Sequence, residues 1–239
     1  MIFSYDYKPV IEDFSKDGKL SLTAILKILE NAGNAHSDYA GDSIFNIAGK
    51  TKAWILTEWS IKIDEYPSYA DEIKAETWSE DLSSPLVANR NFLLYKNGKI
   101  CAKGASVWVL FDMAAQRLSK IDESLLESYK PENKKVFEEK KPAKIEKPES
   151  FAAEKAVEIR RSDIDFNNHV HNLVYLDYAM QVLPQEVYES SKFKSLRVTY
   201  KTAVKGGNNV ICRYAQSDGK HVVFIYNEED QLCTMVQLS

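Results

Sequence analysis

DIDFNNHVHN, residues 163–172, places a carboxylate, an amide and an imidazole within five positions of one another. The apolar residues that follow recur at helical spacing: Leu173, Leu176, Met180 and Leu183. This period predicts a helix over about 170–189. Asp165, Asn167 and His169 then lie where a loop enters the helix. Such a junction presents unpaired backbone N–H groups and the positive end of the helix dipole, which suit a developing oxyanion.

Metal binding is the competing chemistry for this stretch. The alternating acidic and amide residues of 163–167 imitate the opening of a calcium loop, but the sixth position is Asn168 instead of glycine. The twelfth position, which needs a carboxylate, is Val174. His169 and His171 point about 200° apart on a helix and have no evident third ligand. The sequence therefore argues against a metal site.

An ordinary helix entry is the remaining alternative. Asn167 or Asn168 would cap the first turn, and Asp165 would interact with the helix dipole. His169 would fill a partly polar pocket. The local pattern alone leaves this reading and the catalytic one open.

The composition describes an ordinary globular chain. Of 239 residues, 44% are hydrophobic and 28% charged, enough for one large domain or two small ones. The net charge of −4 gives no support to a nucleic-acid partner. The longest fully apolar run, 107–111, is too short for a membrane span or a signal-peptide core. We expect a cytoplasmic protein without membrane insertion.

The cysteines indicate neither a disulfide framework nor a zinc site. They are three, widely separated and without CxxC spacing: Cys101, Cys212 and Cys233. We expect buried free thiols.

Residues 131–150 divide the chain. The stretch holds six Lys, five Glu and three Pro with almost nothing apolar, which is typical of a solvated connector. We expect an N-terminal domain at 1–130, a charged linker at 131–150 and a C-terminal domain at 151–239.

Both halves predict one helix followed by antiparallel strands. In the first half, Leu22, Ile25, Leu26 and Leu29 mark an amphipathic helix of about four turns that ends near Gly33 or Gly41. Residues 59–64 and 73–78 alternate like half-buried strands, and Asn97-Gly98 predicts a type I′ hairpin turn.

The second half repeats this order. Strands are expected at 156–160, 193–201, 210–215, 222–226 and 232–238. The hairpins FLLYKNGKIC (92–101) and VFIYNEEDQLC (223–233) also resemble each other. A helix cradled by an antiparallel sheet, repeated once, predicts an α+β tandem (double) hotdog.

The 163–172 stretch resembles the active-site segment of the acyl-acyl carrier protein thioesterases. The family pattern, roughly D-x-D-x-N-x-H-V-N-N-x-x-Y, is matched by Asp163, Asp165, Asn167, His169, Val170, Asn172 and Tyr175. His171 stands where Asn is usual. Residues 54–78 and 88–112 resemble the family's Trp-rich strand, Tyr-Pro turn and Arg-x-Phe to Ser-x-Trp series.

The resemblance implies hydrolysis of fatty acyl-acyl carrier protein to free fatty acid, without metal or cofactor. Carried over by position, Asp165, Asn167 and His169 are the catalytic set. Asp165 is the candidate nucleophile or water-activating base, and His169 the candidate proton shuttle. Asn167 would orient water, carbonyl or imidazole. The resemblance also makes the first half the acyl-binding half, since its helix lacks a comparable acid–histidine junction.

One position departs from the family. Ala203 stands where many members carry a catalytic Glu, and Val204 where plant members often have Cys. Three alternatives stay open: Asp165 and His169 are sufficient for the reaction, a carboxylate from elsewhere in the chain completes the site, or the activity is reduced.

The implied partner is acyl carrier protein, an acidic protein, so we expect a local basic surface. The candidates lie around one predicted strand: Lys192, Lys194, Arg197, Lys201 and Lys205. A solvated strand face is the equal alternative for these residues. A homodimer is a further expectation.

Two rival functions stay open. One is a hotdog thioesterase that acts on acyl-coenzyme A. The other is a weakly active double hotdog that binds acyl groups or acyl carrier protein, suggested by Ala203 and His171.

Overall fold

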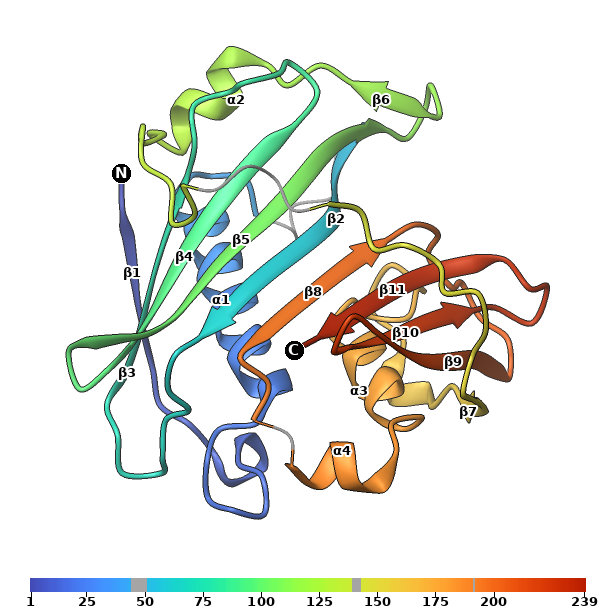
Figure 1. The fold of residues 1–239 in the computed structure, drawn as a ribbon. Coiled ribbons are helices and arrows are strands. Elements are labelled where there is room, and N and C mark those ends of the chain that lie inside the picture. The colour runs from blue at the N-terminus through green and yellow to red at the C-terminus, as the bar shows by residue number, and fades with distance from the viewer. Residues whose placement is uncertain (44–50, 139–142, 191) are drawn as a thin grey trace. The chain divides into compact units, whose positions relative to one another are not determined.

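The structure is a computed structural model that describes residues 1–43, 51–138, 143–190 and 192–239. It divides into two compact units, residues 1–139 and 140–239. Each unit is an antiparallel sheet with helices, the hotdog arrangement predicted from the sequence (Figure 1).

The first unit forms a sheet in the order β1-β3-β4-β5-β2, with β6 paired to β5. All of its strand pairs are antiparallel. Its elements are β1 (Phe3–Tyr7), the short 3-10 turn η1 (Ile11–Asp13), α1 (Leu22–Tyr39), β2 (Lys52–Ile63), β3 (Ile73–Ser79), β4 (Ala88–Lys96), β5 (Lys99–Asp112), β6 (Arg117–Ser119) and α2 (Glu123–Ser128).

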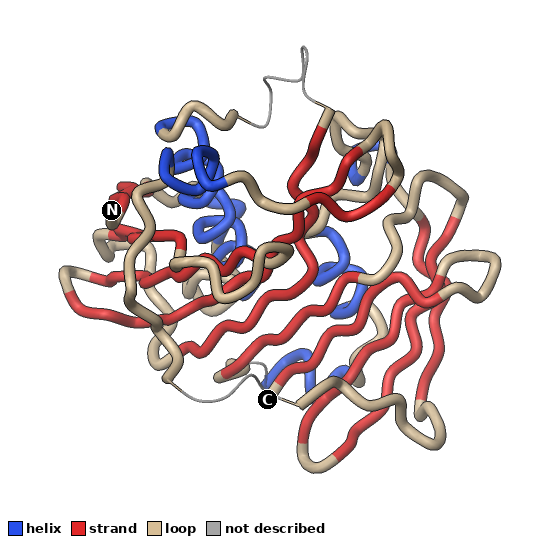
Figure 2. Tube along the Cα trace, turned by 90° about the horizontal axis from the view of Figure 1, so that it is seen from above, coloured by secondary structure: helices blue, strands red, loops and turns tan. Residues whose placement is uncertain are grey.

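Helix α1 covers one face of this sheet, as seen from two directions (Figures 1 and 2). Ser21 caps its start, because the side-chain oxygen accepts the Ala24 N–H at 3.0 Å. Gly41, with φ +77°, follows its C-cap, so the second expected end is correct. A Cβ on Gly104 would lie 3.0 Å from the Leu29 side chain, which shows how closely α1 and β5 pack.

The hairpin between β4 and β5 follows the predicted turn. Asn97 and Gly98 have φ values of +49° and +76°, as a type I′ turn requires. The register shifts between Leu94 and Tyr95, which marks a bulge just before the turn.

The second unit repeats the first strand by strand. Its elements are β7 (Ala153–Glu158), the 3-10 turn η2 (Arg161–Asp163), α3 (Val174–Met180), α4 (Gln185–Ser190), β8 (Ser195–Tyr200), β9 (Asn209–Ser217), β10 (Lys220–Tyr226) and β11 (Leu232–Leu238). The sheet order β7-β9-β10-β11-β8 matches β1-β3-β4-β5-β2 position by position. The β10–β11 hairpin even has its bulge at Tyr226, the counterpart of Tyr95.

The predicted helix over 170–189 is wrong in extent. The chain forms α3 and α4 instead, because Pro184 lacks an N–H and its ring crowds the carbonyl four residues earlier. The helix also starts later than predicted, at Val174. The Val170 N–H binds the Val204 carbonyl at 2.9 Å and the His171 N–H binds the Asp163 carbonyl at 2.9 Å, so both residues are committed to loop pairing.

The described flanks of the charged stretch pack against the units. Ile145 is 6% exposed and belongs to the core of the second unit with Val222 and Phe224. In the first unit, the Trp78 indole donates to the Lys134 carbonyl at 2.7 Å. These contacts differ from a wholly solvated connector, because single apolar or backbone groups dock while their charged neighbours stay in water.

All three cysteines are buried free thiols, as predicted. Among the described residues, no helix is both long and apolar enough to cross a membrane.

Candidate functional site

Hydrogen bonds within 163–172 close the loop into a compact turn. The Asp165 N–H binds the His169 carbonyl at 2.8 Å, and the Asn168 N–H binds the Asp165 carbonyl at 3.0 Å. Asn168 has φ +58°, a left-handed conformation that Asn tolerates. The turn therefore places on one short loop the three residues singled out from the sequence.

Asp165 holds this turn with one carboxylate oxygen. Its Oδ1 accepts the N–H groups of Asn167 at 2.8 Å and His169 at 3.1 Å. Asp165 and His169 are half-buried and Asn167 is exposed. One loop thus presents a carboxylate and an imidazole in partial contact with solvent, which suits acid–base chemistry.

The candidate residues lie on a loop before the helix, as expected, but the helix starts later than the sequence predicts. Helix α3 begins at Val174, five residues after His169. The loop N–H groups of Asn167 and His169 already bind Asp165. The side-chain amide of Asn167 is therefore the better candidate for an oxyanion donor.

Asp163 anchors the start of the loop. Its side chain is buried, and its Oδ2 accepts the Tyr178 hydroxyl at 2.7 Å and the Arg160 N–H at 2.9 Å. The Arg160 guanidinium also binds Oδ1 at 2.9 Å. Burial by itself raises the pKa of Asp163, but hydrogen bonds from Tyr178 and Arg160 outweigh it and hold the pKa below its usual range.

The far side of the loop rests on residues 203–204. The Val170 N–H binds the Val204 carbonyl at 2.9 Å, and the Val204 N–H binds the hydroxyl of Tyr175 at 3.0 Å. Tyr175 is 2% exposed, and burial raises its pKa to about 12. Ala203, where the family resemblance places a Glu, is exposed beside this pairing and contributes no acid.

The first unit contains the same loop without these side chains. Residues 13–21 and 163–171 share backbone bonds: Ser15 N–H to Lys19 carbonyl at 2.8 Å matches Asp165 N–H to His169 carbonyl. The bridges Phe14–Leu20 and Ile164–Val170 also correspond. In this first-unit loop, Ser15, Asp17 and Lys19 occupy the positions of Asp165, Asn167 and His169.

Family models match most of the chain. The acyl-ACP thioesterase N-terminal domain matches residues 1–129, and the acyl-ACP thioesterase C-terminal domain matches residues 146–237. The chain belongs to the acyl-ACP thioesterase family.

Curated relatives of this acyl-ACP thioesterase family chain are plant proteins. It is 24% identical over 218 residues to oleoyl-acyl carrier protein thioesterase 1 of Arabidopsis thaliana, covering 83% of this chain and 60% of the relative. It is 25% identical over 214 residues to the palmitoyl-acyl carrier protein thioesterase of the same plant, covering 84% of this chain and 52% of the relative. The chain thus spans between half and two thirds of the length of these relatives.

Solved structures share the fold of the family. The 12:0-ACP thioesterase from Umbellularia californica has a TM-score of 0.86 at 18% identity, with 100% of this chain and 96% of that chain covered. An acyl-ACP thioesterase from Bacteroides thetaiotaomicron has a TM-score of 0.85 at 19% identity, with 99% and 96% covered. At these identities the likeness establishes the tandem hotdog fold.

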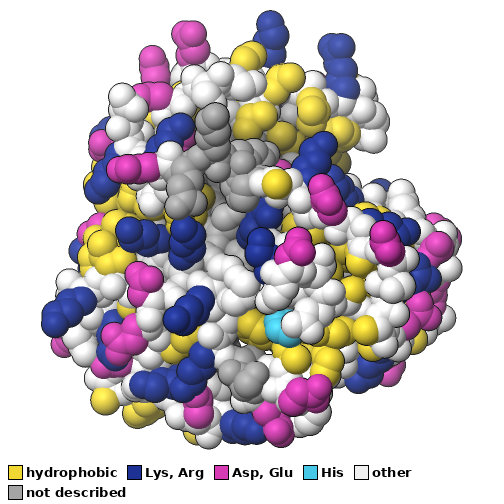
Figure 3. All heavy atoms as spheres, in the orientation of Figure 1, with side chains coloured by type: hydrophobic (Ala, Val, Ile, Leu, Met, Phe, Trp, Pro, Cys, Tyr) yellow, Lys and Arg dark blue, Asp and Glu magenta, His cyan; other side chains and the backbone are white. Residues whose placement is uncertain are grey.

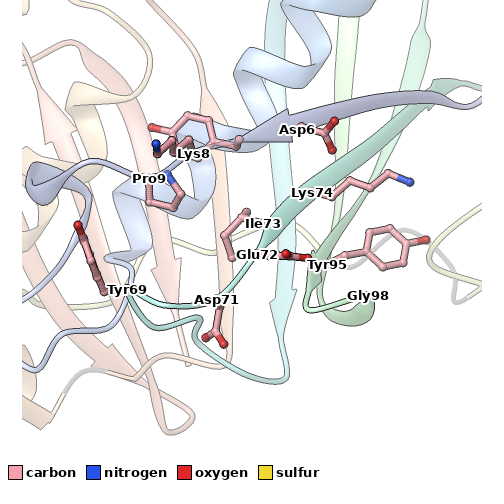
Figure 4. A pocket seen from close by; sticks show the side chains of 11 residues that line it. Asp6, Lys8, Pro9, Tyr69, Asp71, Glu72, Ile73, Lys74, Tyr95 and Gly98 are labelled. Carbon is pink, nitrogen blue, oxygen red and sulfur yellow. The ribbon is translucent and has the colours of Figure 1, made fainter.

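A cavity of about 700 Å³ lies in the first unit of this acyl-ACP thioesterase family chain, along β1, β3 and β4 (Figure 4). Its polar lining includes Asp6, Lys8, Tyr69, Asp71, Glu72 and Tyr95. Several polar groups in it already bind neighbours: Lys74 pairs with Glu76 at 2.9 Å. None of the residues that line the cavity belongs to 163–172. Over the described part of the chain, no group of three or more His, Cys, Asp or Glu is arranged to hold a metal ion.

The predicted basic cluster is dispersed. Arg197 is engaged within the second unit, donating to Gln237 at 3.2 Å and to the Ala143 carbonyl at 2.8 Å. Lys194 and Lys201 are exposed but flank the two ends of β8, about 23 Å apart at ~3.3 Å per residue. Basic and acidic side chains are mixed over the face seen in Figure 3.

Sequence reasoning missed the supports of the loop. Tyr178 reaches Asp163 from α3, and no local spacing signals that contact. The Arg160–Asp163 pair is local, at i and i+3 across the start of η2. The first-unit loop did leave one signal, since Asp13 and Asp163 stand at the same position of the two loops. Apart from that Asp, the two loops share almost no residue identities.

Proposed function

We propose that this chain hydrolyses the thioester of fatty acyl-acyl carrier protein and releases free fatty acid. Asp165, Asn167 and His169 form the reacting site of this proposal. The family membership supports the reaction class, and the second-unit loop supplies the chemistry.

The observation that carries the proposal is the difference between the two loops. The first-unit loop folds with Ser15, Asp17 and Lys19, so the backbone does not need an acid, an amide and an imidazole at those positions. The first-unit loop uses a carboxylate from another position, since Asp17 Oδ1 accepts the Lys19 N–H at 3.1 Å. In the second-unit loop these bonds use only Oδ1 of Asp165, and a histidine stands where the first loop has a lysine. A half-buried carboxylate and a half-buried imidazole on one loop point to catalysis.

The chemistry needs little more than these groups, because a thiolate leaves readily. Asp165 acts as nucleophile or as the base that activates water, and one of its oxygens stays bound to the loop N–H groups. His169 moves the proton. The Asn167 amide orients the carbonyl or the attacking water, and no metal or cofactor is part of the proposal.

The proposed partner is acyl carrier protein, and the exposed Lys194 and Lys201 are the proposed contacts. Arg197 is withdrawn from this set, because its guanidinium binds Gln237 and Ala143. A homodimer and a cytoplasmic location stay predictions, as do the N-terminal acyl-binding domain at 1–130, the linker at 131–150 and the C-terminal catalytic domain at 151–239.

The binding-module alternative is favoured by one observation, the exposed Ala203 beside the loop. Release of free thiol from acyl-acyl carrier protein separates the two functions. The wild type should turn over, and Asp165→Ala and His169→Ala should each lose at least about 100-fold in kcat. Tight binding without turnover would favour the binding module, and preference for acyl-coenzyme A would replace the carrier in the proposal.

A further inference from the structure

We infer that Asp163, together with Tyr178, is a positioning residue for the reacting loop. The inference rests on the proposed function, in which Asp165 and His169 react with the thioester. Asp163 touches neither of the proposed reacting atoms. It acts by fixing the backbone from which those side chains project.

The Asp163 contacts span the entry and the exit of the loop. Its carboxylate binds the Arg160 N–H and guanidinium before the loop and the Tyr178 hydroxyl on α3 after it. Its backbone carbonyl accepts the His171 N–H at 2.9 Å. One buried residue thus ties three segments, and Asp165 and His169 lie between the tied points.

Helix α3 holds the opposite side of the loop through a second hydroxyl. Tyr175, one turn from Tyr178, accepts the Val204 N–H at 3.0 Å, and the Val204 carbonyl accepts the Val170 N–H. Both ends of the loop are therefore held by hydrogen bonds that involve the same short helix, α3. Small displacements of a reacting group are costly for rate, so this support should appear in kcat.

The first unit supplies a matched control. Asp13 is equally buried, binds the Val10 N–H at 2.9 Å and the Tyr7 hydroxyl at 2.8 Å, and pairs with Lys27. Its loop bears no acid–histidine pair. Loss of the Asp13 anchor should thus cost stability without disordering reacting groups.

The experiment compares Asp163→Asn and Tyr178→Phe with Asp13→Asn and Tyr7→Phe in the full chain. Thermal unfolding, kcat and KM for acyl-acyl carrier protein are measured for each. Asp163→Asn should lose at least tenfold in kcat with KM changed less than threefold, whereas Asp13→Asn should keep kcat within twofold at a similar fall in Tm. The double variant Asp163→Asn/Tyr178→Phe should lose less than the product of the single losses, because both changes remove one contact.

A kcat loss in Asp163→Asn no larger than in Asp13→Asn would overturn the inference and leave the proposed function standing. An inactive wild type would instead overturn the proposed function. Amide hydrogen exchange tests the positioning role in either case. Exchange over 163–172 should accelerate in Asp163→Asn and Tyr178→Phe while the rest of the second unit keeps its protection, and unchanged protection of 163–172 would contradict the inference.

Discussion

Asp13 and Asp163 each sit buried at the base of a loop, where an ionised carboxylate needs full hydrogen bonding. For Asp13, burial raises the pKa, but hydrogen bonds from Lys27, the Val10 N–H and Tyr7 outweigh it and leave the pKa below its usual value of 3.8. The pKa of Asp163 is likewise below its usual value, because hydrogen bonds from Tyr178 and Arg160 outweigh the effect of burial. Both residues are therefore stabilising as anions.

Acid should remove this stabilisation. Because the pKa of each carboxyl is lower in the folded state, its contribution is complete above about pH 3.8 and is lost as pH falls through the folded value. Wild-type Tm should fall steeply below pH 4, and Asp13→Asn or Asp163→Asn should make that fall shallower. Thermal unfolding monitored from pH 6 to pH 2 checks this, and parallel curves for all three proteins would contradict it.

Ala203 allows a second prediction at the residue scale. If Asp165 and His169 are sufficient for the chemistry, Ala203→Glu should change kcat by less than about threefold, since it adds a carboxylate that has no assigned role. Ala203→Gln is the size-matched control. A gain of tenfold or more with Glu and not with Gln would show that the natural site lacks its working acid.

At the scale of elements, α1 is fastened to the sheet by a buried polar network. The Arg90 guanidinium donates to the Gly33 carbonyl and to His36 Nδ1, both at 3.1 Å, and lies over the Tyr129 ring. His36 is fully buried. Burial first, and the Arg90 charge second, lower the pKa of His36 from 6.5 to about 3.

This network should make the first unit sensitive to mild acid. Because the pKa of His36 is lower in the folded state, folding favours its neutral form. The contribution of His36 to stability is therefore complete above pH 6.5 and declines as pH falls towards 3. The decline can reach about 1.4 kcal/mol per pH unit, the slope for one proton. His36→Gln should flatten the free energy of unfolding between pH 6 and pH 4, measured by urea titration at each pH. Equal slopes for both proteins would refute a buried neutral His36.

Elements with local signals were predictable, and elements shaped by distant contacts were not. Asn97-Gly98 marks its turn because both positions require φ > 0. Pro184 is equally visible and should have ended the predicted helix. The docking of Ile145 and the contact of Tyr178 with Asp163 depend on chain segments brought together only by folding. The candidate side chains were found from their spacing, but their supports were not.

At the scale of the molecule, each unit repeats one plan with different residues. The strand orders β1-β3-β4-β5-β2 and β7-β9-β10-β11-β8 correspond, and both begin with a loop anchored on a buried Asp. The similarity of the two hairpins revealed this repeat in the sequence. The correspondence of the two loops could not be predicted from the sequence, because backbone hydrogen bonds keep their shape while their side chains differ. One copy bears the acid–histidine pair and the other does not.

The chain carries a net negative charge, which bears on the proposed partner. A net charge of −4 repels an acidic protein, so the proposed docking of acyl carrier protein relies on local lysines. Lys194→Glu with Lys201→Glu should raise KM for acyl-acyl carrier protein at least threefold without changing kcat. Lys99→Glu with Lys220→Glu, at two hairpin turns, controls for net charge. Equal KM changes in the two double variants would rule out a contact at Lys194 and Lys201.

The most direct test is hydrolysis of acyl-acyl carrier protein substrates of increasing chain length by the wild type and by the double variant Asp165→Ser/His169→Lys. Thermal unfolding of both proteins shows whether the variant is folded. The double variant gives the second-unit loop two residues of the first-unit loop. It should fold normally, because the Asn167 side-chain oxygen can accept the residue-169 N–H as Asp17 accepts the Lys19 N–H at 3.1 Å. We predict turnover by the wild type and a loss of at least about 1,000-fold in the variant at an unchanged Tm. Full turnover by the folded variant would place the chemistry elsewhere and contradict the account.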